Sequence, residues 1–341
     1  MTATENTYNI EGLLRHFEPP VLIVSTIVGR GAYRIGEAIE EKFSGQSQIY
    51  HIPIEHLLPH QAVNEDMERY RTISTRFPFL LYLIYKIPIF YYRKYLREKF
   101  FNTMQLDRLK EKIESLNIKT VICVSHRPAF WVSSLRRKTK KDFKIWGILV
   151  EYGSNLGWRY IFWEELAGFL SPIARDKIGC RLPPNVEFIK IDLPVKKDCS
   201  GLSTTKGDVN KVLLVCGFWG QGPVLKILKS LSIEMPYLKI YALCGTNDKL
   251  YEAAKQLFKN NANIEIYSTV ESLAPFLKEC ASVITKPGMS TILETSAAHR
   301  KIFLLKGMPV AEDNNARFAM EHFDSEWFKI KRFKKWREGE M

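Results

Sequence analysis

The sequence predicts an α/β protein with two Rossmann-like domains, each built on a parallel sheet, that face each other across a cleft. The first observation is a strand, glycine turn and helix pattern in residues 21–43, where a β-branched run leads into Gly29-Arg30-Gly31. The second is a regular alternation of strand-like and helical patterns from residue 211 to residue 322. Such alternation is typical of parallel strands joined by helical crossovers.

The predicted elements follow in this order along the chain. In the N-terminal half, strands are expected at residues 21–27, 120–125 and 144–150, with a helix at 33–43. In the C-terminal half, strands at 211–216, 238–244, 263–267, 281–285 and 301–305 each precede a helix, at 223–232, 248–259, 271–279, 290–298 and 314–322. A stretch without apolar period separates the halves. We therefore expect an N-terminal domain (1–195), a linker (196–210), a C-terminal domain (211–326) and a basic tail (327–341).

Composition excludes several classes of protein. At 341 residues, with 46% hydrophobic and 26% charged residues, the chain is too apolar to be disordered and long enough for two cores. The net charge of +13 predicts attraction to an anion, which could belong to a nucleic acid, a phosphate-bearing substrate or an acidic membrane surface.

Cysteine spacing and hydropathy indicate in which cellular compartment the protein is expected. The six cysteines show no C-x-x-C spacing, and we interpret them as reduced thiols of a cytoplasmic protein rather than disulfides or metal ligands. Residues 1–20 are acidic and lack an apolar core, so no signal or transit peptide is expected. The longest uncharged apolar run, 77–85, is shorter than the roughly 20 residues that a spanning helix needs.

The most specific motif is Val283-Ile-Thr-Lys-Pro-Gly-Met-Ser-Thr-Ile-Leu-Glu294, a buried strand, a glycine turn and a helix start. Unpaired backbone N–H groups and the positive end of the helix dipole would suit a diphosphate there. Glu294 could accept hydrogen bonds from ribose hydroxyls. The alternative is an ordinary capped helix with Ser290 as N-cap.

A second glycine turn, Gly217-Phe-Trp-Gly-Gln-Gly-Pro223, follows the first strand of the same half. Gly217, Gly220 and Gly222 would let the backbone approach a phosphate closely. No Lys-Ser or Lys-Thr follows, so this is not a Walker motif. Two such turns at carboxyl ends of one sheet favour nucleotide binding.

These motifs, with Cys244-Gly-Thr-Asn247 and Glu312-Asp-Asn-Asn315, resemble the ordered motifs of GT-B-type glycosyltransferases that make glycolipids. The resemblance is to monogalactosyldiacylglycerol synthases and processive diacylglycerol glucosyltransferases, and more distantly to the peptidoglycan N-acetylglucosaminyltransferase. It covers about residues 21–323 and implies a GT-B fold with a UDP-sugar bound by the C-terminal domain and no bound metal or other cofactor.

Carried over position by position, the resemblance assigns the donor-binding residues. It implies glycine-turn and helix-start contacts to the diphosphate, Glu294 at the ribose, residues 270–273 at the uracil, and Glu312 and Asp313 at the sugar. Family members often have Gln-Glu where this chain has Glu312-Asp313, so the sugar stays open, and these two acids could instead be favourable charges near a helix N-terminus. The donor-binding set is Gly217, Gly220, Gly222, Asn247, Val270, Leu273, Met289, Ser290, Thr291, Glu294, Glu312, Asp313 and Asn315.

The N-terminal half departs from the resemblance at the catalytic base. Where the family has Gly-Gly-Gly-His, this chain has Gly29-Arg30-Gly31-Ala32, so the usual histidine is alanine. An acceptor hydroxyl still needs a base. Glu151, which follows the strand at 144–150, is the preferred candidate, and His126, which follows the strand at 120–125, is the second.

Residues 69–110 form a basic aromatic segment, with ten Lys or Arg against Glu98 and Asp107. Cations with interleaved aromatic rings are typical of an interfacial membrane segment. RNA binding by base stacking and a buried helical hairpin with solvated basic faces are the alternatives. The expected membrane contacts are Phe77, Phe79, Tyr82, Tyr85, Lys86, Tyr91, Arg93, Lys94 and Arg97. The tail from Trp327 is similar in character, or is an exposed helix packing across the two domains.

The sequence thus predicts a hexosyltransferase on the inner face of the membrane that moves a sugar from a UDP-sugar to a lipid hydroxyl, with inversion implied by the resemblance. Its expected partners are the UDP-sugar, the lipid acceptor and an anionic membrane surface, and not nucleic acid. One alternative is a UDP-sugar 2-epimerase, which would need several acids and histidines around the sugar. The other is a non-catalytic or partner-dependent relative, for which Ala32 is the reason.

Overall fold

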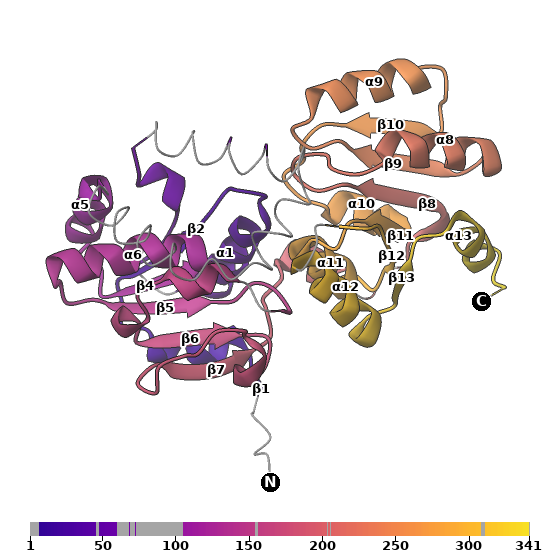
Figure 1. Ribbon diagram of the computed structural model, residues 1–341. Helices are drawn as coiled ribbons and strands as arrows, with labels where there is room; N and C mark the ends of the chain where they lie inside the picture. The colour runs from indigo at the N-terminus through magenta and orange to yellow at the C-terminus, as the bar shows by residue number, and fades with distance from the viewer. Residues whose placement is uncertain are drawn as a thin grey trace, which may run out of the picture. The chain divides into compact units, whose positions relative to one another are not determined.

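The structure is a computed structural model that describes residues 7–45, 48–59, 68, 72, 105–153, 156–202, 204, 206–307 and 311–340. The chain passes between Pro194 and Val195 from one compact unit to a second, called here the N-terminal and the C-terminal unit. Each unit contains one parallel sheet with helices on its faces (Figure 1).

The N-terminal unit has a seven-stranded sheet in the order β1-β7-β6-β5-β4-β2-β3, and every neighbouring pair is parallel. Its strands are β1 (Thr7–Tyr8), β2 (Val21–Ser25), β3 (Ile49–Pro53), β4 (Thr120–Val124), β5 (Lys144–Ile148), β6 (Gly168–Ser171) and β7 (Glu187–Ile191). Its helices are α1 (Gly31–Lys42), α5 (Asp107–Ser115) and α6 (His126–Thr139). Short 3-10 turns are η1 (Ile10–His16), η2 (Ile54–His56), η3 (Leu156–Tyr160), η4 (Trp163–Glu165) and η5 (Arg175–Lys177).

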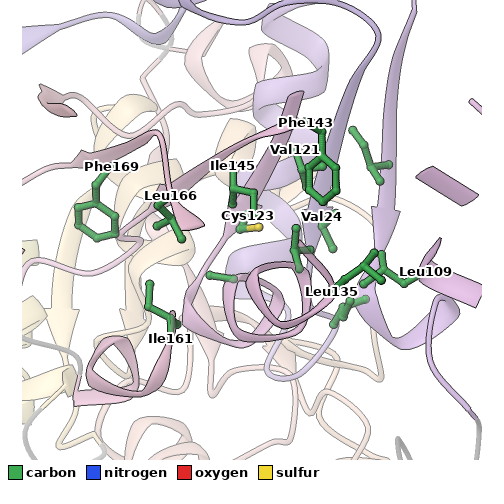
Figure 2. Packing of buried hydrophobic residues seen from close by; sticks show 14 of the residues in the cluster. Val24, Leu109, Val121, Cys123, Leu135, Phe143, Ile145, Ile161, Leu166 and Phe169 are labelled. Carbon is green, nitrogen blue, oxygen red and sulfur yellow. The ribbon is translucent and has the colours of Figure 1, made fainter. Parts of the chain in front are cut away.

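Both faces of this sheet are covered, which explains why β2 and β4 read as continuous apolar runs. On one face, Val121 and Cys123 of β4 pack with Leu109 of α5 and Leu135 of α6 (Figure 2). On the other, α1 contacts β2, β3, β4 and η1, and its Ile35 and Ile39 are buried.

The C-terminal unit has a six-stranded sheet in the order β10-β9-β8-β11-β12-β13, again entirely parallel. Its strands are β8 (Asp208–Val215), β9 (Lys239–Leu243), β10 (Ile264–Tyr267), β11 (Cys280–Thr285), β12 (Lys301–Leu304) and β13 (Ser325–Trp327). Its helices are α7 (Lys197–Ser200), α8 (Val224–Glu234), α9 (Asp248–Phe258), α10 (Ala274–Glu279), α11 (Met289–Ala297), α12 (Ala311–His322) and α13 (Ile330–Arg337).

The helices of this unit form separate hydrophobic clusters with the sheet. α8, α9 and α13 share one cluster with residues of β8, β9 and β12, while α7 and α10 share another with β8, β9 and β11. Ala316 and Ala319 of α12 pack with Ile292 of α11 and with β12. The alternating pattern from residue 211 therefore produces the doubly wound parallel sheet that was predicted, and the fold class is confirmed.

Some details differ from the sequence-based elements. The stretch predicted as a linker contains α7, whose Cys199 is fully buried, and β8 begins within it at Asp208. The tail contains α13, which packs by Phe333 against the core of the C-terminal unit. Strands β1, β3, β6, β7 and β13 were not predicted, because they are short and lack a long apolar run; β3 is only half-buried.

Candidate functional site

Three glycine-bearing turns meet at one edge of the C-terminal sheet. β9, β8 and β11 are neighbours and parallel, so their carboxyl ends lie at the same edge. Residues 216–223 follow β8, residues 244–247 follow β9, and residues 286–288 follow β11. This is the edge at which open α/β sheets bind ligands.

The first two turns are hydrogen-bonded to each other. The backbone N–H of Thr246 donates to the carbonyl of Phe218 at 2.7 Å, and Nδ2 of Asn247 donates to the carbonyl of Gly220 at 3.5 Å. Oδ1 of Asn247 also accepts from the N–H of Leu250 at 3.1 Å and so caps α9. Asn247, predicted as a donor-binding residue, thus holds the shape of the turn.

Backbone conformation explains the glycines of the turn at 217–222. Gly217, Gly220 and Gly222 have φ of 71°, 57° and 119°, values that strain other residues. A Cβ at Gly220 would overlap the carbonyl oxygen of Cys244 and lie 2.9 Å from Cβ of Asn247. A Cβ at Gly217 would overlap the side chain of Lys286. Backbone conformation therefore favours glycine at all three positions, and packing between the turns excludes a side chain at Gly220, independently of any ligand.

We expect Gly220→Ala to lower the unfolding free energy by about 1–3 kcal/mol, because it adds both backbone strain and a clash. The matched control is Gly288→Ala in the neighbouring turn. Gly288 has φ of −73°, and a Cβ there would meet no atom within 4 Å. Urea unfolding of both variants measures the difference, and equal losses would contradict this account of the turn.

The helix that follows β11 begins without a side-chain cap. Its first residue is Met289 and its N-cap is Gly288, which makes no capping hydrogen bond through a side chain. Ser290 lies inside the first turn, so the alternative in which Ser290 caps the helix is wrong. Met289 is buried, and Ser290 and Thr291 are half-buried. The first-turn N–H groups have the geometry that binds an anion.

A charged pair lies beside this helix start. Nζ of Lys286 is 2.8 Å from Oε1 of Glu312 and 3.3 Å from Oε1 of Gln221. The Lys286 and Glu312 side chains are 17% and 8% exposed. One ammonium group therefore links the turn after β8, the turn after β11 and the start of α12. No role was predicted for Lys286. Its position directly after a buried strand was the feature of the sequence that could have indicated one.

The other predicted donor residues take varied places. Glu312 and Asp313 lie in the first turn of α12, where acidic side chains are favourable, in agreement with the alternative for them. Nδ2 of Asn315 donates to the carbonyl of Pro287 at 3.2 Å. Glu294 is 4% exposed on α11. Val270 and Leu273 pack against one hydrophobic cluster, Leu273 being buried and Val270 only partly so.

The candidate bases lie at neighbouring strand ends of the N-terminal unit. β5, β4 and β2 are consecutive in the sheet and parallel (Figure 1). Glu151 follows β5, His126 follows β4, and the turn Gly29-Arg30-Gly31 follows β2. The structure thus brings all three to the same edge of the sheet. Their order in the sequence alone does not require this.

His126 is the first residue of α6 and is half-buried, with one ring nitrogen fully buried. Its Nδ1 is buried and has no hydrogen-bond partner in the part of the chain that the structure describes. The backbone of Gly157 lies against the ring, and Trp158 contacts it edge-on at 6.3 Å between centroids. Burial, and secondarily the charge of Arg127, lowers the pKa of His126 to about 4. The imidazole is therefore neutral at pH 7 and can accept a hydrogen bond or a proton.

Ser125 adds strain at the same place. This non-glycine residue has φ of 114°, and its buried Oγ lacks a hydrogen-bond partner among the described residues. Strained backbone and unsatisfied buried polar atoms both cost free energy and concentrate at functional sites. The end of β4 therefore combines a strained residue with two unsatisfied buried polar atoms among the described residues.

Glu55 holds the turn after β2. Its carboxylate accepts from the hydroxyl of Thr26, and its Oε2 accepts from the N–H of Ile27 at 3.1 Å. Glu55 is 5% exposed, and a buried carboxylate is rarely retained without such partners. Ala32 lies in the first turn of α1. Glu55 was not predicted as a site residue. The hint in the sequence was an acidic residue in the mostly apolar stretch that follows β3.

A serine, a histidine and a glutamate also line up at β2 and β3. Oγ of Ser25 is 2.7 Å from Nε2 of His51, whose Nδ1 is 3.4 Å from Oε2 of Glu40. This is the order of a hydrolase triad. Ser25, however, is fully buried, and burial lowers the pKa of His51 to about 4. No substrate reaches a buried hydroxyl, so we interpret this group as structural.

Metal-ligand clusters and membrane-spanning helices are both absent from the described residues. These residues contain no group of three or more His, Cys, Asp or Glu side chains placed to hold a metal ion. None of their helices is long and apolar enough to cross a membrane. The predicted membrane contacts Phe77, Phe79, Tyr82, Tyr85, Lys86, Tyr91, Arg93, Lys94 and Arg97 lie outside the described residues.

Comparison with known proteins supplies relatives at low identity. No protein-family model matches the chain. It is 21% identical over 313 residues to the processive diacylglycerol beta-glucosyltransferase of Bacillus cytotoxicus, covering 87% of this chain and 79% of that protein. MurG of Acinetobacter baumannii superposes with a TM-score of 0.53 at 12% identity, covering 94% of this chain and 90% of MurG.

The fold is also shared with a different class of enzyme. UDP-GlcNAc 2-epimerase from Neisseria meningitidis, solved with UDP-GlcNAc, gives a TM-score of 0.50 at 11% identity, covering 93% of this chain and 91% of that protein. The two parallel sheets and these likenesses agree with the resemblance seen in the motifs. The chain therefore has the GT-B fold and is a distant relative of the processive diacylglycerol glucosyltransferases.

Proposed function

We propose that the protein is a glycosyltransferase that moves a hexose from a UDP-sugar to a hydroxyl group of a membrane lipid, with inversion at the anomeric carbon. The observation that carries the proposal is the carboxyl edge of the C-terminal sheet, where a glycine turn, an uncapped helix start and Lys286 come together. The distant relation to diacylglycerol glucosyltransferases supports transfer to a lipid.

In this proposal the C-terminal unit binds the donor. The first-turn N–H groups at Met289, Ser290 and Thr291 and the backbone of the glycine turn hydrogen-bond the diphosphate. Glu294 binds the ribose and residues 270–273 meet the uracil. Glu312, Asp313 and Asn315 contribute to the sugar end, and Asn247 keeps the glycine turn in shape.

The transfer is a single displacement. The acceptor oxygen forms a bond to the anomeric carbon while the bond from that carbon to the diphosphate oxygen breaks, and UDP leaves with the electron pair. The hydroxyl proton passes to a base, for which we propose Glu151, with His126 as the second candidate. Glu151 is half-buried at the end of β5, and His126 is neutral at pH 7.

Negative charge grows on the diphosphate during this step. Backbone N–H groups fixed by the turn and the helix can stabilise that charge without reorganising. Lys286 adds a positive charge whose present partners are Glu312 and Gln221. We propose that the leaving diphosphate competes for this ammonium, so that Lys286 serves the reaction as well as the fold.

The membrane part of the proposal rests on the sequence. Ten Lys or Arg with interleaved aromatic rings in residues 69–110 are the proposed contact with an anionic lipid surface on the cytoplasmic side. The name of the distant relatives, processive diacylglycerol beta-glucosyltransferase, states an activity on a lipid, and this supports a lipid acceptor in the proposal.

UDP release tests the proposal. Purified protein is incubated with UDP-glucose, UDP-galactose or UDP-N-acetylglucosamine and liposomes that contain diacylglycerol, a glycosyldiacylglycerol or neither. We expect UDP release that depends on one donor and one acceptor. Conversion of the UDP-sugar without acceptor would support a 2-epimerase, the class of the Neisseria structure. UDP binding without release under any condition would support a non-catalytic relative, the alternative for which Ala32 is the reason.

A further inference from the structure

The C-terminal helix α13 is anchored to the C-terminal unit by aromatic rings. Phe333 is fully buried and contacts Phe303 edge-on at 5.0 Å between centroids, and Trp336 contacts Phe303 at 5.5 Å. Ile330 packs at the edge of the same cluster. The helix is thus a fixed part of this unit, and its outward face has a defined orientation.

The outward face of α13 carries three lysines. Lys331, Lys334 and Lys335 have the i, i+3, i+4 spacing that places side chains on one face, and Phe333 points to the opposite side. All three are exposed. Residues 330–337 contain five Lys or Arg and no acid, and Glu338 and Glu340 follow the helix.

These three lysines are grouped on one helix face without an acidic partner among the described residues, whereas several cations nearby are paired. Arg332 lies 3.4 Å from Glu326, and Arg337 donates to the hydroxyl of Tyr237 and to Oδ1 of Asn210. Lys211 and Lys239 pair with acids of neighbouring strands or helices at 2.8 and 2.6 Å. Lys331, Lys334 and Lys335 form no ion pair with any residue that the structure describes. Like charges at this spacing repel, and the aromatic anchor holds them together nonetheless.

We propose that this face of α13 docks on the anionic headgroups of phospholipids, as a membrane contact separate from residues 69–110. The charge of the face complements such a surface, and each lysine close to it raises the partition coefficient about fivefold, or about a hundredfold for the three. Trp327, which is 38% exposed just before the helix, is of the type enriched at membrane interfaces.

A lipid surface fits this face better than a nucleic acid. Proteins that bind single strands combine cations with exposed rings on which bases stack. The two rings of α13 itself, Phe333 and Trp336, are turned into the core and are not offered to a ligand. The exposed rings nearby, Trp327 and Tyr237, lie outside α13, so the outward face of the helix itself presents only positive charge.

Vesicle sedimentation of the full chain tests the inference. The variant is Lys331→Gln/Lys334→Gln/Lys335→Gln, and the vesicles are phosphatidylcholine with or without about 30% phosphatidylglycerol. We expect the variant to lose up to about a hundredfold in partitioning to the anionic vesicles at low salt, and the wild type to lose most of the same binding at high salt. The variant and the wild type should bind vesicles of pure phosphatidylcholine equally.

The matched control is Lys249→Gln/Lys255→Gln/Lys259→Gln. These lysines are also exposed and lie on or directly after α9 in the same unit. Their substitution removes the same net charge as the α13 variant. Equal losses in the two variants would show a net-charge effect and overturn the proposal, as would no loss in the α13 variant. Loss of binding to a labelled single-stranded RNA with unchanged vesicle binding would also overturn it, in favour of nucleic acid.

The inference rests on the proposed function only in assuming a lipid environment, and the two can fail separately. The α13 variant should release UDP at the wild-type rate from acceptor dispersed in detergent, because none of its three residues lies in the proposed donor site. Wild-type protein that partitions as expected but releases no UDP would contradict the proposed function and leave the docking surface supported.

Discussion

A Lys286→Met variant is expected to lose about 3 kcal/mol of unfolding free energy, because it leaves the Glu312 carboxylate charged and without its cation in a buried site. The two groups are 2.8 Å apart, and Glu312 is 8% exposed at its side chain. Water cannot solvate that carboxylate fully there. Urea unfolding at pH 7, followed by a signal that reports on the C-terminal unit, measures the loss.

Two controls separate this pair from an ordinary surface ion pair. Lys286→Met/Glu312→Gln removes both charges, so most of the lost stability should return. Lys211→Met breaks a pair with Glu279 of the same 2.8 Å length whose side chains are 33% and 48% exposed, and it should cost less than about 1 kcal/mol. Equal losses in Lys286→Met and Lys211→Met, or no recovery in the double variant, would refute the buried-pair account.

The same double variant tests the catalytic part. Compared with Glu312→Gln alone, it should release UDP about 100-fold more slowly, because the ammonium that we propose stabilises the leaving diphosphate is gone. Equal rates for these two variants would restrict Lys286 to a structural role.

The second large effect is expected at Glu151. Glu151→Gln should lower kcat about 100-fold or more and leave the affinity for UDP unchanged, since the amide keeps the size of the side chain but cannot take the acceptor proton. Steady-state UDP release and calorimetric titration with UDP give the two quantities. A near-normal rate would remove Glu151 as the base.

His126 is then judged by substitution, because a pKa of about 4 gives the same loss of activity at acid pH as an ordinary carboxylate base. Burial lowers its pKa to about 4, and a base works only when deprotonated. If His126 is the base, kcat/KM stays level from pH 8 to about pH 5 and falls as the pH drops toward 4, and His126→Gln removes activity. If Glu151 is the base, His126→Gln retains substantial activity at pH 7.

Local pattern was sufficient for most of the fold. The apolar runs that became β2, β4, β8 and β11 are continuous because helices cover both faces of each sheet. Short strands such as β13, and α7 inside the polar stretch before β8, left no comparable signal. Their stability comes from packing against distant residues, as the fully buried Cys199 of α7 illustrates.

The candidate site divides in the same way. The glycines at 217, 220 and 222 were readable from the sequence, because a cluster of glycines directly after a strand is typical of a tight turn. The interactions of Lys286, which join it to residues 65 and 26 positions away, were not. Neither was the role of Glu55, which depends on the pairing of β2 with β3.

The sequence by itself determined the parallel α/β architecture, the glycine turns at the carboxyl ends of its strands and the absence of the family's histidine at Ala32, because each is a property of residues close together in the chain. Tertiary structure alone decided that Lys286 is bound to Glu312, that Nδ1 of His126 is enclosed without a partner among the described residues and that three lysines of α13 face outward. Burial and the pairing of charges depend on which distant segments meet, and only the folded chain brings those segments together.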